Sequence, residues 1–208
     1  MIEVNWLLFV AASLVLIVTP GQDMILVMSR SIAQGALAGM ATATGVCTGL
    51  VVHTVVAALG LGTLIRASEW LYLGLQLGGA VYLACLGLQL LRAPQRQLEI
   101  AGSACTRPAR MFFDGALSNI CNPKIVLFYL AFLPQFVAPG AKHATLSLFV
   151  LGLVFAALAL LVKAPIGLGA AALSSWLRAY PQSLVWLFRS SGIVLLGLGL
   201  QLALQRPL

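Results

Sequence analysis

Long apolar stretches separated by short polar segments account for most of this 208-residue sequence. A helix needs about 20 mainly apolar residues to cross the hydrocarbon core of a bilayer. The pattern predicts an all-α polytopic membrane protein with six transmembrane helices. They are expected near residues 6–28, 40–65, 70–91, 112–137, 146–168 and 184–204. Because Pro20 and Asp23 interrupt the first stretch, a re-entrant first segment with five spans remains an alternative.

Two of these stretches contain a proline break. Thr19-Pro20-Gly21 interrupts the first stretch and Asn122-Pro123-Lys124 interrupts the fourth. Proline lacks a backbone N–H and breaks the helix around it. Irregular backbone at membrane depth is tolerated only where protein or a water-filled cavity satisfies its polar groups. Paired breaks in corresponding segments indicate a transporter's binding site, so the two breaks are expected to face each other across a central cavity.

The polar segment 92–111 separates two groups of three apolar stretches. We therefore expect one transmembrane domain, 1–208, with halves 1–100 and 101–208 and a cytoplasmic linker at about 92–111. An odd number of spans in each half makes the halves antiparallel, as in transporters built from two inverted three-helix repeats. The broken helices would be the first and the fourth.

Composition excludes a soluble protein, because only 8% of the residues are charged whereas soluble domains carry roughly 25%. The net charge is +7, but the cations stand singly between apolar stretches, which favours a role in membrane orientation over nucleic-acid binding. With six spans, one face receives Arg30, Arg92, Arg96, Arg107, Arg110, Arg178 and Arg189, and the other Arg66, Lys142 and Arg206. Cytoplasmic loops carry the excess of Lys and Arg, so both termini are expected outside.

Three ionisable residues fall at membrane depth: Asp23, Lys124 and Lys163. Such residues are costly in lipid and usually mark substrate or proton pathways. We expect Asp23 to be a proton-coupling carboxylate paired with a lysine, Lys163 fitting better by depth. Alternatively, Asp23 stabilises a helix N-terminus and Lys163 extends to the cytoplasmic interface. His53, near the middle of its span, is either a proton relay or a satisfied core histidine.

The remaining polar groups cluster at the breaks. The half-helix ends offer amides for a carboxylate and carbonyls for an ammonium, so a zwitterion would fit between them. The expected substrate-binding set is Thr19, Pro20, Gly21, Asn119, Asn122, Pro123 and Lys124. Asp23, Lys163 and His53 form the expected proton-coupling set.

Several kinds of chemistry lack a signal in the sequence. The four cysteines follow no metal-binding spacing, so neither a metal site nor a disulfide is expected. No phosphate-binding P-loop is present, and no nucleophile stands with a convincing base. The sequence thus predicts a transporter without a cofactor, and not an enzyme.

The motifs around the breaks resemble those of the LysE/RhtB amino-acid exporters. Thr19-Pro20-Gly21-Gln22-Asp23 is similar to the family's Thr-Pro-Gly-Pro signature. Other matching segments are the spaced Gly35, Gly39, Gly45 and Gly49, the segment Tyr82-Leu83-Ala84-Cys85-Leu86-Gly87, and Asn122-Pro123-Lys124 with Phe128, Phe132 and Leu133-Pro134-Gln135-Phe136 after it. The resemblance covers essentially the whole chain. Gln22 departs from the family, which often has a second proline there.

The resemblance implies a multi-pass protein of the bacterial inner membrane that exports amino acids or close derivatives, driven by the proton gradient. Its partners would be an amino-acid substrate, protons and the lipid bilayer, and not nucleic acid; a homo-oligomer is left open. A cation or metal exporter of related architecture is the main alternative, although few carboxylates lie within the spans to bind a hard cation. A membrane-embedded enzyme and a small channel or scaffold are further alternatives.

Overall fold

The computed structural model describes residues 6–19, 21–67, 69–92, 107–137 and 143–204. These residues form helices and no strand, which confirms the all-α architecture. The elements are α1 (Trp6–Val18), α2 (Gln22–Gln34), α3 (Ala36–Ala67), α4 (Glu69–Leu91), α5 (Pro108–Ile120), α6 (Pro123–Phe132), the 3-10 helix η1 (Leu133–Phe136), α7 (Ala144–Ala179) and α8 (Pro181–Leu204).

Both predicted breaks separate two helices that bend sharply against each other. The axes of α1 and α2 meet at 52°, and those of α5 and α6–η1 meet at 59°. Each bent pair is long and apolar enough to count as one span, and α3, α7 and α8 qualify alone, which gives up to five spans. The apolar part of α4, Gln76–Leu91, is shorter; with it the number reaches the six predicted. The chain is a polytopic membrane protein.

Local sequence explains where the helices around the breaks begin and end. Pro108 and Pro123 occupy the first turns of α5 and α6, where a missing N–H costs nothing. The start at Pro108 places residues 108–111 of the expected linker inside a helix; residues 93–106 lie outside the described part. Helix α2 ends at Gly35, which has a φ of 91°. Residues with a side chain disfavour this conformation, and it allows the chain to turn from α2 toward α3.

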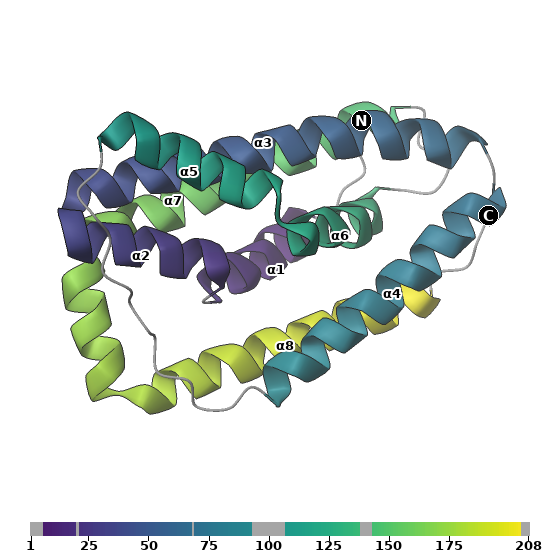
Figure 1. Cartoon of the computed structure of the whole chain (residues 1–208). Coiled ribbons are helices and arrows are strands. Elements are labelled where there is room, and N and C mark those ends of the chain that lie inside the picture. The colour runs from purple at the N-terminus through teal and green to yellow at the C-terminus, as the bar shows by residue number, and fades with distance from the viewer. Residues whose placement is uncertain (1–5, 20, 68, 93–106, 138–142, 205–208) are drawn as a thin grey trace.

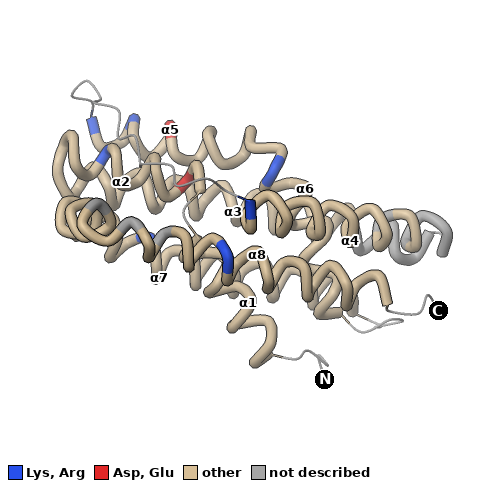
Figure 2. The backbone as a smooth tube through the Cα atoms, turned by 90° about the horizontal axis from the view of Figure 1, so that it is seen from below, with Lys and Arg blue, Asp and Glu red and all other residues tan. Residues whose placement is uncertain are grey.

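The helices form a central body with a second layer beside it (Figure 1). In the body, α3 packs most extensively against α7 and α5, while α4 packs mainly against α8 in the second layer. Helix α7 bends at Gly169, whose φ of −105° and ψ of 18° are not helical, a geometry that glycine adopts more readily than other residues. Its last turns then cross to α8 (Figure 1). Figure 2 shows charged positions scattered singly along an otherwise uncharged backbone.

Glycines allow the closest helix contacts. A Cβ at Gly45 in α3 would lie 2.0 Å from the carbonyl oxygen of Phe112 in α5. In the second layer, a Cβ at Gly87 would lie 2.8 Å from the carbonyl oxygen of Gly192, and the reverse distance is the same. Small residues let helix backbones approach closely in lipid, where the hydrophobic effect does not drive helix association.

The helix crossings between the two halves have similar but not identical spacings in sequence. Gly87 and Gly192, which meet between α4 and α8, are 105 residues apart. Between α3 and α7, the contacts Thr54–Gly152 and Gly39–Gly167 show that the helices run antiparallel. The midpoint of these two contacts lies near residues 46–47 of α3 and 159–160 of α7, about 113 residues apart. The division into two inverted halves stays a prediction.

Candidate functional site

A cavity of about 310 Å³ lies where the two breaks meet α3, α4, α7 and α8. Its polar lining is Thr19, Gln22, Asp23, Asn122, Lys124 and Lys163, with Gly21 beside them. Residues from both predicted site sets therefore share one cavity. Pro20 lies outside the described residues, and Pro123 begins α6 without lining the cavity.

Side-chain hydrogen bonds join the two breaks directly. Asn122 Nδ2 donates to Gln22 Oε1 over 3.4 Å, and Asn119 Nδ2 donates to Asp23 Oδ2 over 2.8 Å. The breaks thus lie beside each other, as the sequence predicted; binding of a substrate between them stays a prediction. Gln22, which stands where the Thr-Pro-Gly-Pro signature has its second proline, supplies one of these two contacts.

Asp23 is a buried carboxylate with one oxygen left over. Only 7% of its surface is exposed, and Oδ1 has no hydrogen-bond partner among the described residues. It lies in the first turn of α2, where the helix dipole favours a negative charge, but the N-cap itself is Gly21. A buried polar atom without a partner carries a desolvation cost, so Oδ1 marks a place for a cation, a proton or water.

Lys163 reaches the same cavity from α7. It is buried, with 7% exposed, so it does not extend to the molecular surface as one alternative expected. The direct Asp23–Lys163 ion pair that we predicted is not formed, since no nitrogen–oxygen distance between them is within 4.0 Å. In the described part of the chain, the ion pair formed is Arg30–Asp114, at 3.1 Å.

His53 stands behind the cavity instead of lining it. Its Nε2 lies 3.1 Å from the carbonyl oxygen of Asn119, and its ring centroid is 5.8 Å from that of Tyr129. Because a carbonyl only accepts, Nε2 carries the hydrogen in this contact. Asn119, which is fully buried, therefore connects His53 to Asp23. Both interpretations of His53 remain open.

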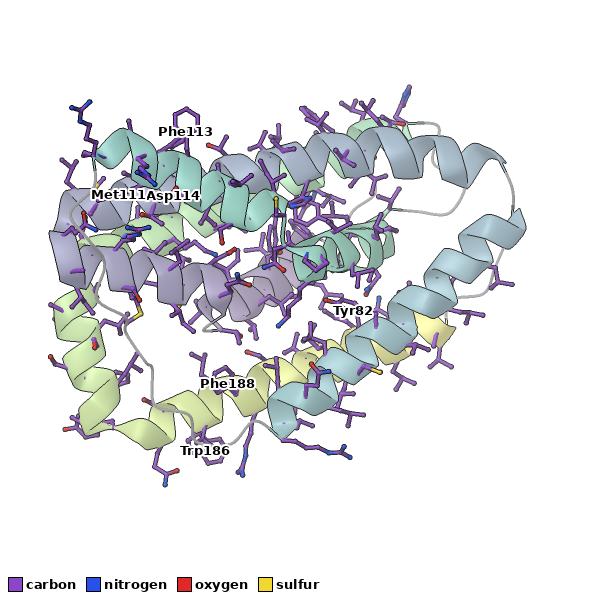
Figure 3. The ribbon with its side chains drawn as sticks, in the orientation of Figure 1. Tyr82, Met111, Phe113, Asp114, Trp186 and Phe188 are labelled. Carbon is purple, nitrogen blue, oxygen red and sulfur yellow. The ribbon has the colours of Figure 1, made fainter. Side chains whose placement is uncertain are left out.

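Polar side chains of the second layer contact both breaks. At the second break, Tyr82 on α4 donates its hydroxyl to the carbonyl oxygen of Lys124 over 3.0 Å, and its side chain extends from α4 toward α6 in Figure 3. At the first break, the hydroxyls of Thr19 and Ser191 on α8 contact each other. Sequence reasoning missed Tyr82 and Ser191, although a serine inside an apolar stretch was an available signal.

The rest of the cavity wall is apolar. It includes Leu50 of α3, Phe128 of α6, Phe155 of α7 and Leu195 of α8. The rings of Phe128 and Phe155 are 5.6 Å apart. They continue into a cluster of aromatic side chains made by Phe9, Tyr129, Phe132 and Phe136. The sequence did not single out this wall, because apolar residues fill every span.

The described residues contain no group of three His, Cys, Asp or Glu side chains placed to hold a metal ion. Asp23 and Asp114 belong to separate contacts. The site offers a buried carboxylate with one unpartnered oxygen, two lysines, two amides and an apolar wall.

Comparison with known proteins places these features in context. A family model described as "LysE type translocator" matches residues 14–206. The "Homoserine/homoserine lactone efflux protein" of Salmonella typhimurium is 30% identical over 202 residues, which cover 97% of each chain. The "Leucine efflux protein" of Klebsiella pneumoniae is 32% identical over 72% of this chain and 71% of its own. The "Threonine efflux protein" of Escherichia coli is 28% identical over 96% of this chain and 99% of its own. No solved structure matches.

Proposed function

Because the chain belongs to the LysE type translocator family, we propose that it exports amino acids through the cavity between the two breaks, in exchange for protons. Family membership makes it a multi-pass transporter of the bacterial inner membrane and not an enzyme. The names of its relatives, which are efflux proteins for leucine, threonine and homoserine, support an amino-acid cargo.

The observation that carries the proposal is that Asp23 lines the cavity and has a buried Oδ1 without a hydrogen-bond partner. An ionised carboxylate in a poorly hydrated site needs a cationic partner or a proton. Lys163 is not bonded to it, so the partner must arrive from outside the protein. The ammonium group of an amino acid and a proton both meet this need, and they cannot occupy the same oxygen together.

Backbone groups at the breaks support this placement of the ammonium group. The carbonyl oxygens of Val15, Leu117 and Asn119, close to the ends of α1 and α5, already accept hydrogen bonds from within the chain. Asp23 is thus a better partner for the ammonium than the helix carbonyls that the sequence suggested.

The substrate carboxylate would lie between the lysines and the start of α2. At α6, Pro123 has no N–H and Asn122 Oδ1 already accepts from the Lys124 amide over 3.0 Å. At α2, Gly21 is the N-cap and provides no side-chain acceptor, so the first amides remain available to a carboxylate. Lys124 and Lys163 line the same cavity and supply positive charge.

Competition for Asp23 gives the coupling. A proton that enters from outside neutralises the carboxylate and releases the ammonium; loss of that proton to the cytoplasm restores the site for the next substrate. Each exported amino acid is then exchanged for one proton that enters the cytoplasm, so the proton gradient drives accumulation of the amino acid outside.

The test is Asp23→Asn in proteoliposomes with an imposed pH gradient. We expect gradient-driven amino-acid accumulation to be lost, while the protein still folds and exchange of labelled for unlabelled amino acid continues in part. Asp114→Asn is the matched control, because Asp114 pairs with Arg30 outside the cavity; it should retain gradient-driven accumulation. Full accumulation by Asp23→Asn, with unchanged pH dependence, would show that the coupling group lies elsewhere, with His53 the next to test.

A further inference from the structure

The cavity has two chemically different ends. Its polar groups all belong to the two breaks or to Lys163, whereas the walls from α3, α4 and α8 are apolar. We infer that this transporter selects amino acids with an uncharged aliphatic side chain, an inference that rests on the proposed export function.

The direction of the helices separates the two ends in space. Helix α6 starts at the second break, so Phe128 lies one turn beyond Lys124. On α7, Phe155 and Lys163 are eight residues apart, which corresponds to about 12 Å along a helix. Since the rings of Phe128 and Phe155 lie together, both helices place their aromatic wall on the same side of the polar groups. An amino acid bound by its charged groups at Asp23 and the lysines would direct its side chain toward this wall.

The apolar wall has no hydrogen-bonding partner for a polar substrate side chain. It consists of Leu16, Ile17, Leu50, Phe128, Phe155 and Leu195, with leucines of α4 beside them, and none of these side chains has a hydrogen-bonding atom. The nearby Tyr129 hydroxyl is buried, interacts with Thr54 and does not line the cavity. A hydroxyl or an ammonium at the end of the substrate side chain would lose its water without gaining a partner. Threonine, homoserine and lysine are therefore disfavoured.

The wall is also firmly supported. Phe128 stacks on Phe132 with ring centroids 4.8 Å apart, and Phe155 contacts Tyr129 edge-on at 5.8 Å. Leu195 is fully buried and closes the cavity from α8. Because packed side chains resist displacement, the volume beyond the polar groups is limited, and Leu195 is a specificity-determining residue.

The experiment measures the flux of individual labelled amino acids into a common preparation of proteoliposomes. Leucine, isoleucine and methionine form the aliphatic group; threonine, homoserine and lysine form the polar group. We expect half-saturation concentrations at least about tenfold lower for the aliphatic group, since mismatches of this size change discrimination by roughly 10- to 200-fold. Transport that favours the polar group would overturn the inference and leave amino-acid export intact. Absence of flux for every amino acid would instead refute the proposed function.

Variants then test the wall itself. Leu195→Ala should raise the half-saturation concentration of leucine about tenfold and improve transport of phenylalanine relative to leucine. Leu198→Ala is the matched control, since Leu198 is also buried on α8 but does not line this cavity. Phe155→Tyr, a change that keeps the ring, should improve homoserine relative to leucine by supplying a hydrogen-bonding group. Unchanged substrate ratios in both Leu195→Ala and Phe155→Tyr would overturn the assignment.

Discussion

Gly49 occupies the place where α3 approaches Asn119, and replacing it by alanine tests the polar connection at the centre of the molecule. A Cβ at position 49 would lie 2.6 Å from Asn119 Oδ1, 2.8 Å from its Cβ and 3.0 Å from its Cγ. These distances are too short for carbon contacts, so Asn119 must move. Asn119 is fully buried and donates to Asp23, so its movement disturbs the hydrogen bond to the carboxylate.

The expected cost combines two terms. Overpacking a well-packed core costs roughly 1–3 kcal/mol, and a hydrogen bond to a charged group contributes roughly 1.5–3 kcal/mol. Alanine gains about 1 kcal/mol over glycine in a helix, which offsets part of this loss. We expect the free energy of unfolding to fall by about 2 kcal/mol. By the scale of soluble domains of this length, the melting temperature would fall by about 4–8 °C.

The assay is thermal unfolding in detergent, with transport measured on the same preparations. Gly60→Ala is the control, because Gly60 lies on the same helix and a Cβ there would meet nothing within 4 Å. It should melt at the wild-type temperature or slightly above. If Gly49→Ala melts and transports like Gly60→Ala, then α3 does not press on Asn119, and the connection from His53 through Asn119 to Asp23 is refuted.

Two further predictions concern the topology and the second break. With the native cysteines replaced, a single cysteine at position 143 should react with a membrane-impermeant maleimide in intact cells, whereas one at position 110 should not. Both positions are exposed in the structure. Labelling at position 110 would show that the predicted orientation is reversed. Asn122→Ala should destabilise the protein by about 1 kcal/mol through loss of the α6 cap, measured by unfolding. Asn122→Ser keeps a capping oxygen without reaching Gln22, so it should preserve stability but reduce transport; equal transport by Asn122→Ser and the wild type would show that the Gln22 contact is dispensable.

The sequence predicted those features that depend on local chemistry. The chain breaks between α5 and α6 at Pro123, and the described helices on either side of position 20 separate, both as expected. Hydropathy marked the spans but not their full lengths: α3 begins at Ala36 and α7 extends to Ala179, because helices continue into polar residues that a hydropathy pattern excludes. Inside α7, the backbone departs from helical geometry at Gly169, a bend that hydropathy does not mark, while Gly167 stays helical and packs against Gly39.

The site was predictable only for residues that differ from their surroundings. Asp23, Lys163 and Asn122 stand out among apolar neighbours, so their membership of one site could be anticipated. Distances between them could not, since they depend on how helices far apart in the sequence cross. The separation of Asp23 from Lys163 and the position of Asn119 between Asp23 and His53 are consequences of that packing.

If the second half repeats the first with the 105-residue spacing of Gly87 and Gly192, there is a consequence for the direction of transport. Two identical inverted halves would treat the two sides of the membrane alike, because each half would present to one side what the other presents to the opposite side. The charges break this equivalence. The position 105 residues before Lys163 is Ala58, and Val126 stands as far after Pro123 as Asp23 does after Pro20. In such a protein, the features that the halves share would shape the passage, and the charges that they do not share would set the direction of transport.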